Sequence, residues 1–389
     1  MRNKISNFVN SPTFSGSLLL VAALLALLWA NSGFSSSYEA LKGLRLSLPI
    51  LALDKPLELW VNDFLMAIFF LLVGLELKRE ILTGELSNPR GASLAIFAAL
   101  GGMLVPALIY IMLNRGTLGA SGWGIPMATD IAFAVGVLSL LGSRVPVALK
   151  VFLVALAVVD DMGAVIVIAI FYTSKIDPLM LGLVGVVLAA LWGLNAARVK
   201  VLPLYLLFGL VLWYVVLKSG LHATIAGVLL ASTIPLGKET NSPLETLEHW
   251  LKKPVNFAIM PIFALFNAGV PIGTALAGGV NQITTGVFWG LLLGKPIGIT
   301  LFSWLAVRSG ISQLPRGATW AMLLGVGMLG GIGFTMALFI ANLAFKNNPA
   351  LLETAKLGVL SASFCTAILG LVWLHFCSKK GSPEALPTS

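Results

Sequence analysis

The chain has 389 residues, of which 58% are hydrophobic and 11% are charged, and its formal net charge is +9. Soluble domains carry about 25% charged residues, so this composition excludes an ordinary cytosolic enzyme. Long apolar runs instead predict an all-α polytopic membrane protein. They exclude a transmembrane β-barrel, whose short strands alternate apolar and polar residues. The basic residues lie in short clusters between the apolar runs, which is typical of membrane orientation signals rather than of nucleic-acid binding.

Twelve apolar runs are candidate membrane-spanning helices. They cover residues 14–30, 58–81, 94–113, 121–141, 149–172, 178–197, 203–218, 222–236, 252–271, 286–307, 321–345 and 357–377. With both termini in the cytoplasm, roughly two-thirds of the 25 Lys and Arg residues fall on the inner side. This bias predicts a multi-pass membrane protein with cytoplasmic N- and C-termini. The tail 382–389 is expected to be disordered.

The loop after the first span, between about residues 31 and 57, contains a short alternating segment. Residues 44–48 read Leu-Arg-Leu-Ser-Leu. Alternation of this kind predicts a strand, here one half of a short β-hairpin on the outer side that reaches Leu53. An unstructured loop is the alternative.

Two of the twelve spans look interrupted. Residues 124–130 of the fourth span read Gly-Ile-Pro-Met-Ala-Thr-Asp, and the eleventh span has five glycines between 325 and 333, followed by Phe334 and Thr335. Proline removes a backbone donor and glycine readily adopts extended backbone, so both favour interrupted helices. Close helix packing through small residues is the alternative. Paired interruptions, one of them carrying an acid, indicate a transporter core built from inverted repeats.

Four charged residues stand near the middle of apolar spans. Asp160 and Asp161 lie about ten residues into the fifth span, Asp130 lies in the interrupted fourth, and Lys295 lies in the tenth. A charge at this depth costs ~2.5–3.5 kcal/mol on insertion scales. Adjacent carboxylates also repel each other, so at least one of the pair should hold a proton near neutral pH. A buried pair kept for packing specificity is the alternative, although uncharged polar residues would do this at lower cost.

The interruptions suggest roles for these charges. Where two broken helices cross, Asp130 would balance the positive ends that face each other, and Lys295 would balance the negative ends. Carboxylate and hydroxyl oxygens, such as that of Thr129, suit Na+ or Li+. We expect protons and a cation to compete for Asp160 and Asp161, with Lys295 neutralising Asp160 when no cation is bound. Such a site, opened alternately to each side, is an antiporter.

Several motifs resemble those of the NhaA family of bacterial sodium/proton antiporters, over about residues 13–375. The most specific are FFLLVGLELKRE at 69–80, ATDIAF at 128–133, the Asp160-Asp161 pair, KSGLHAT at 218–224, GKP at 294–296 and GIGFTM at 331–336. The resemblance implies a six-helix core with inverted repeats and two interrupted, crossing helices, at 94–172 and 286–377. A panel at 14–81 and 178–271 would lie beside it, and a homodimer would form partly through the hairpin at 43–54, which would then be periplasmic.

The resemblance also implies the activity. A member of this family lies in a bacterial inner (plasma) membrane and is an electrogenic, pH-regulated transporter that extrudes Na+ or Li+ in exchange for H+, with no cofactor and no enzymatic reaction. The cation site would lie at Asp160 and Asp161, with Asp161 as the direct ligand and Asp160 paired with Lys295. Thr129 and Asp130 would lie where the interrupted helices cross.

The pH response of the family is attributed to a cytoplasmic funnel. The resemblance assigns it to Glu76, Arg79, Glu80, Glu248 and His249, together with His222. The alternatives are a salt-bridged helix end for the first three and a solvated loop face for the next two. Lys252 stands where a second histidine often follows in the family, so a shifted or broadened pH threshold is expected.

Three other classes of membrane protein also place charges within the bilayer. An intramembrane aspartyl protease needs acids on two helices, whereas Asp160 and Asp161 are neighbours about 100° apart on one. A cation channel needs a ring of acids or carbonyls around a pore, and the chain has no filter-like repeat. A sodium-coupled symporter of a small solute is the main alternative, and it would need a polar pocket beyond Thr129 and Thr335.

Overall fold

The computed structural model describes residues 12–49, 52–173, 176–237, 242–273 and 281–378, so the predicted disordered tail at 382–389 lies outside the described residues. The chain is mostly helical, which confirms the predicted fold class. It divides into two compact units as far as its residues are described: Met1–Ser17, Asn88–Asp160 and Gly278–Ser389 form unit 1, and Leu18–Ser87 and Asp161–Ala277 form unit 2. The assignment of core and panel roles to 94–172 with 286–377 and to 14–81 with 178–271 stays a prediction.

Unit 1 consists of helices, several of them short. They are α6 (Pro89–Asn114), η4 (Leu118–Met127), α7 (Ile131–Ser139), η5 (Gly142–Arg144), α15 (Gln282–Trp289), η7 (Gly290–Gly294), α16 (Lys295–Arg308), α17 (Trp320–Gly330), α18 (Phe334–Ala344) and α19 (Pro349–Cys377). Helix α8 (Val147–Phe171) continues from unit 1 into unit 2, and α2 (Pro12–Ala30) likewise has residues in both.

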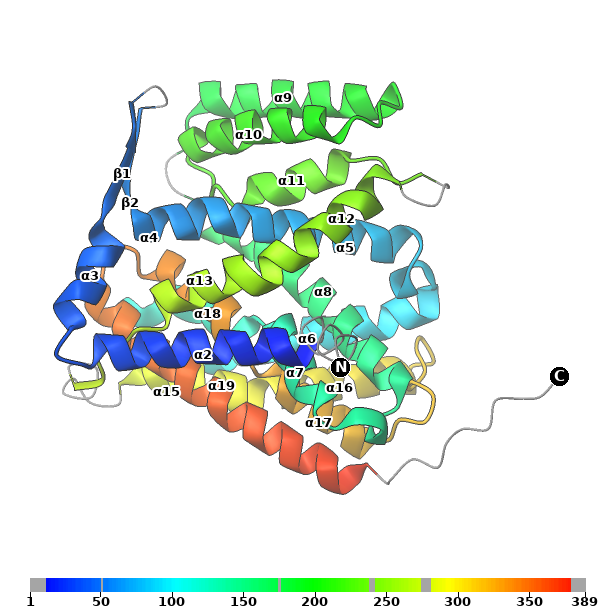
Figure 1. Cartoon of the computed structure of the whole chain (residues 1–389). Coiled ribbons are helices and arrows are strands. Elements are labelled where there is room, and N and C mark those ends of the chain that lie inside the picture. The colour runs from blue at the N-terminus through cyan, green and yellow to red at the C-terminus, as the bar shows by residue number, and fades with distance from the viewer. Residues whose placement is uncertain (1–11, 50–51, 174–175, 238–241, 274–280, 379–389) are drawn as a thin grey trace, which may run out of the picture. The chain divides into compact units, whose positions relative to one another are not determined.

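Unit 2 contains further helices and a small sheet. They are α3 (Ser35–Gly43), β1 (Arg45–Leu48), β2 (Leu53–Pro56), α4 (Leu57–Trp60), η2 (Val61–Leu65), α5 (Met66–Leu82), η3 (Glu85–Ser87), α9 (Pro178–Ala196), α10 (Leu202–Ser219), α11 (Ile225–Thr233), α12 (Pro243–Pro254), η6 (Val255–Ile259) and α13 (Met260–Asn267). The strands pair antiparallel, with Arg45 opposite Pro56 and Leu48 opposite Leu53 (Figure 1). The predicted hairpin is therefore confirmed.

Ten of the twelve predicted spans match helices that could cross a membrane. Within the described residues, eight helices are long and apolar enough to do so, or ten if each of two bent pairs is one span. The other two predicted spans are 222–236 and 252–271. The first corresponds to α11, which has only 9 residues, whereas the second lies on continuous helix, because α12, η6 and α13 follow one another without a gap from Pro243 to Asn267. Helix α11 stops because Pro235 holds the preceding residue, Ile234, in extended backbone.

Close packing in unit 1 places the mid-membrane lysine. A side chain on Gly101 of α6 would overlap the carbonyl of Gly298 on α16, and a side chain on Gly298 would overlap that of Gly101. Small residues let membrane helices approach in this way. Lys295, the first residue of α16, is thereby held in the interior with 1% of its surface exposed.

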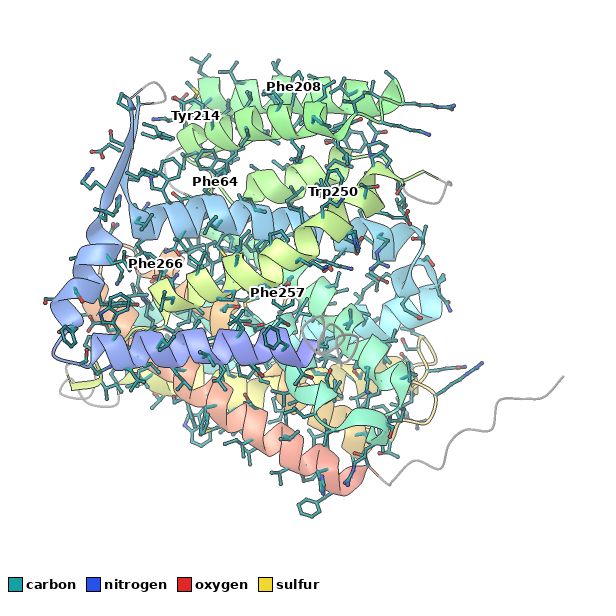
Figure 2. All side chains as sticks on the ribbon, in the orientation of Figure 1. Phe64, Phe208, Tyr214, Trp250, Phe257 and Phe266 are labelled. Carbon is teal, nitrogen blue, oxygen red and sulfur yellow. The ribbon has the colours of Figure 1, made fainter. Side chains whose placement is uncertain are left out.

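Aromatic packing in unit 2 holds the long helix that follows the hairpin. Phe64 of η2, labelled in Figure 2, meets the ring of Trp213 on α10 edge to face, with 5.1 Å between centroids. The Trp213 indole Nε1 donates to the carbonyl oxygen of Asp63 at 3.3 Å. That carbonyl lies within a π-helical turn, and such turns leave backbone groups in need of other partners.

Candidate functional site

The first interruption lies between η4 and α7, which are bent by 44°. Gly124 and Pro126 lie inside η4, a 3-10 helix, because proline's fixed φ is compatible with helical backbone. The extended backbone comes later, at Ala128 (φ −81°, ψ 148°) and Asp130 (φ −88°, ψ 101°). The breaker segment 124–130 therefore predicts the correct span, but the break itself follows Met127.

The second interruption lies between α17 and α18, which are bent by 46°. A Cβ atom on Gly331 would lie 2.5 Å from the carbonyl oxygen of Leu291, and one on Gly333 would lie 3.1 Å from that of Ala128. These two glycines therefore allow other backbone segments to approach the break. Gly325, in contrast, packs within α17 against Leu374. Interruption and close packing both occur in this span, at different glycines.

The two interruptions meet and bond to each other. The backbone N–H of Asp130 donates to the carbonyl oxygen of Ile332 at 2.7 Å. The hydroxyl of Thr129 donates to the carbonyl oxygen of Gly330, also at 2.7 Å. The second bond satisfies one of the last carbonyls of α17, which have no partner within their own helix.

Asp130 caps the beginnings of two helices at once. Its Oδ1 accepts from the backbone N–H of Phe133 at 2.9 Å, at the N-terminus of α7. Its Oδ2 accepts from the backbone N–H of Thr335 at 3.2 Å and from the Thr335 hydroxyl, at the N-terminus of α18. The side chain is buried, with 1% exposed. A carboxylate in this place satisfies orphan donors and is favoured by the positive ends of both helices.

Lys295 contacts two of the other predicted residues. Its Nζ lies 2.6 Å from Oδ2 of Asp160 and donates to the Thr129 hydroxyl at 2.9 Å. Asp160 and Lys295 are each 1% exposed, and so is Asp161, the next residue along α8. Thr129 therefore connects the lysine to the C-terminal end of α17. The carboxylate of Asp130, although next in sequence to Thr129, is bonded to the starts of α7 and α18.

Two polar residues of this arrangement are not among the predicted site residues. Thr335 lies in the GIGFTM segment, but nothing in that segment indicates that it holds Asp130. Ser363 of α19 accepts a hydrogen bond from the backbone N–H of Phe334 at 3.0 Å and is 5% exposed. A serine in an apolar helix most often bonds its own helix. Its residue type alone therefore gives no signal for this contact.

Most residues predicted to sense pH form a cluster of ion pairs in unit 2. Glu248 of α12 lies 3.0 Å from Nε of Arg79 and 2.7 Å from Nζ of Lys252. Arg79 also pairs with Glu80 at 2.9 Å, and Lys252 lies 3.6 Å from Glu76. We call these five residues the Glu248 cluster. The side chain of Glu248 is 6% exposed, so the alternative of a solvated loop face does not hold for it.

The two histidines predicted to sense pH lie in different places. His249 is exposed and lines a cavity of about 650 Å³ together with Glu248 and Trp250, which is labelled in Figure 2. His222 has Nδ1 2.8 Å from the Thr224 hydroxyl and Nε2 3.9 Å from Oδ1 of Asp63. Asp63 precedes Glu76 by about 20 Å of helix at ~1.5 Å per residue. His222 is therefore separate from the Glu248 cluster.

Comparison with known proteins identifies the family. The family model described as Na+/H+ antiporter 1 matches residues 6–374. The Na(+)/H(+) antiporter NhaA of Shewanella sp. (strain W3-18-1) is 49% identical over 388 residues, which cover 98% of this chain and 100% of the relative. The Na(+)/H(+) antiporter NhaA of Citrobacter koseri is 48% identical over 378 residues, covering 95% and 97%.

A solved structure shares the fold. The sodium proton antiporter MjNhaP1 of Methanocaldococcus jannaschii superposes with a TM-score of 0.60 over 98% of this chain and 99% of that chain, at 14% sequence identity. The shared fold agrees with the full-length sequence matches, the meeting interruptions and the apolar spans. The chain belongs to the Na+/H+ antiporter 1 family, as do the NhaA proteins, and it is a multi-pass membrane antiporter of Na+ and H+.

Proposed function

We propose that this antiporter is a secondary active transporter that extrudes Na+ or Li+ in electrogenic exchange for H+, with Asp160 and Asp161 as the shared site for cation and protons. The observation that carries the proposal is the buried ion pair of Asp160 with Lys295, at 2.6 Å, together with the buried Asp161, the next residue in the sequence. Buried charges within a membrane are expensive and are found mainly where transport requires them.

The charges of the site determine what can be exchanged. With Asp161 protonated and Lys295 paired with Asp160, the site has no net charge. When Na+ binds the carboxylate oxygens, it replaces the lysine as the partner of Asp160, and a second positive charge there is unfavourable. Lys295 and Asp161 then release protons. Because more than one proton leaves for each Na+ that binds, exchange moves net charge, and the membrane potential drives it.

The contacts of Thr129 link ion binding to the backbone. Lys295 donates to the Thr129 hydroxyl, and this hydroxyl donates to the carbonyl of Gly330 at the end of α17. When Lys295 loses a proton, the hydrogen bond that it donates to the Thr129 hydroxyl changes. Thr129 lies at the point where the two interruptions are bonded. Alternating access would arise from small movements at this crossing, where the backbone is outside regular helix.

Inside-out vesicles from a host without its own antiporters test this proposal. A respiratory pH gradient is followed with a dye while NaCl, LiCl or KCl is added at neutral and alkaline pH. We expect Na+ and Li+, but not K+, to dissipate the gradient, more strongly as the pH rises. Asp161→Asn should abolish the response. Asp177→Asn is the matched control, because Asp177 caps α9 and asparagine caps equally well. A full response from Asp161→Asn would place the site elsewhere.

We propose that the Glu248 cluster, with His249 at its exposed edge, contributes to the pH response, and that His222 acts separately beside Asp63. Lys252→His tests the cluster. Lysine keeps its charge over the physiological range, whereas an ordinary histidine loses its charge near pH ~6.5. In the variant, Glu248 would lose one of its two charged partners as the pH rises and keep only Arg79. We expect a steeper rise of vesicle transport with pH. An unchanged profile would exclude Lys252 from the response.

The membrane arrangement is also part of the proposal. The distribution of Lys and Arg supports an inner-membrane protein with both termini cytoplasmic. The hairpin supports a homodimer, because β1 is exposed along its whole length and a strand edge offers backbone groups for pairing with a second copy. Light scattering of the protein without residues 45–56 would show whether the dimer depends on the hairpin.

A further inference from the structure

Ser363 holds the start of α18 from a different helix. It lies midway along α19, and its Oγ accepts from the backbone N–H of Phe334, the first residue of α18, at 3.0 Å. The side chain is 5% exposed. Packing one turn further along α19 holds this part of the helix in place. The Thr366 hydroxyl donates to the Ser363 carbonyl at 3.1 Å, and the Thr366 methyl would lie 2.9 Å from a Cβ on Gly331.

The start of α18 depends on such outside partners. The first N–H groups of a helix have no acceptor within the helix, and the bilayer offers no water to replace one. Gly333, which precedes the helix, has no side chain to cap it. Ser363 takes the amide of Phe334, and Asp130 takes the amide of Thr335. Of two neighbouring donors, one therefore bonds to a neutral hydroxyl and the other to a carboxylate of the proposed site.

We propose that Ser363 is a positioning residue for Asp130. Because its hydroxyl satisfies the Phe334 amide, the carboxylate of Asp130 is left to the Thr335 amide and hydroxyl and to the Phe133 amide. Without Ser363, the unsatisfied amide would draw the carboxylate toward itself. The backbone of Asp130 is bonded to Ile332, so this pull would displace the interruption that carries Thr129.

This inference rests on the proposed function, since Thr129 and Asp130 belong to the proposed site. It predicts weaker cation binding while every cation ligand and proton carrier is still present. The half-saturating Na+ concentration should therefore rise while the maximal rate is largely kept. A merely structural role would instead lower the amount of active protein and leave the half-saturating concentration unchanged.

The test is Ser363→Ala in inside-out vesicles at fixed pH, with Na+ titrated. We expect the half-saturating Na+ concentration to rise about five- to tenfold, as for loss of one hydrogen bond to a buried donor. Ser363→Thr retains the hydroxyl and should restore most of the affinity. Ser361→Ala is the matched control on the same helix, because the Ser361 hydroxyl bonds only to Leu357 and Gly358, carbonyls of its own helix, among the described contacts.

Two results would overturn the proposal. One is a half-saturating Na+ concentration for Ser363→Ala equal to that of Ser361→Ala. The other is a loss of maximal rate and of melting temperature in detergent with unchanged Na+ dependence. Asp161→Asn in the same vesicles tests the proposed ion site separately from the Ser363 proposal. Full activity of that variant would refute the ion site. The Ser363 result is judged only from the shift in Na+ dependence.

Discussion

Replacing Lys295 with methionine should destabilise the protein by about 3–5 kcal/mol and abolish Na+/H+ exchange. The lysine Nζ lies 2.6 Å from Oδ2 of Asp160, and both side chains are 1% exposed. Removing one partner leaves the other as an uncompensated buried charge, which is far costlier than the net value of the pair. The loss should be smaller at acid pH, because Asp160 can then bind a proton and become neutral.

Thermal unfolding of the detergent-solubilised protein measures this effect. The double variant Asp160→Asn, Lys295→Met removes both charges and should regain most of the lost stability, but not transport. Lys346→Met changes an exposed lysine and is the control for loss of a positive charge. Equal stability of Lys295→Met and Lys346→Met, or strictly additive effects of the two buried substitutions, would contradict the interpretation.

Replacing Asp130 with alanine should have the second large effect, a loss of about 2–5 kcal/mol in stability. The substitution removes the acceptor for the Phe133 amide and for the Thr335 amide and hydroxyl, at the starts of α7 and α18. All three donors are then left without an acceptor at a buried position. Asp130→Asn keeps one acceptor oxygen but no charge, so we expect an intermediate loss.

Asp177→Ala provides the matched comparison for Asp130. Asp177 accepts from Leu179 and Met180 at the start of a single helix, α9. Its removal should cost about 1 kcal/mol, the ordinary value for one cap. Unfolding of the two alanine variants in the same detergent gives the ratio directly. Similar losses for both would mean that Asp130 does not stabilise a second helix.

The charged part of the site could be predicted from sequence because its residues stand out. A lysine or a pair of aspartates within an apolar span is costly. Residue type and depth therefore identify Lys295, Asp160 and Asp161 as candidate site residues. The meeting of spans four and eleven was likewise predictable from their paired breakers. The exact break was not: Gly124 and Pro126 fit a 3-10 helix, and the extended backbone begins at Ala128.

The neutral parts of the site could not be predicted in this way. Ser363 bonds to Phe334 across 29 residues of sequence, and a serine is compatible with almost any position in a membrane helix. The length of α11 was overestimated for a related reason. Apolar composition continues past the end of this helix, while the local backbone geometry at Ile234 stops it.

Because of the bond between the two interruptions, hydrogen exchange of one amide reports on their separation. In a regular helix, an amide proton exchanges with solvent only when the helix unwinds around it. The acceptor of the Asp130 amide is Ile332, on the other interrupted span, at 2.7 Å. Its exchange does not require any helix to unwind, only the separation of the two segments. The rate of deuterium uptake at this single position therefore reports local opening of the crossing. It can be measured whether or not an ion is transported.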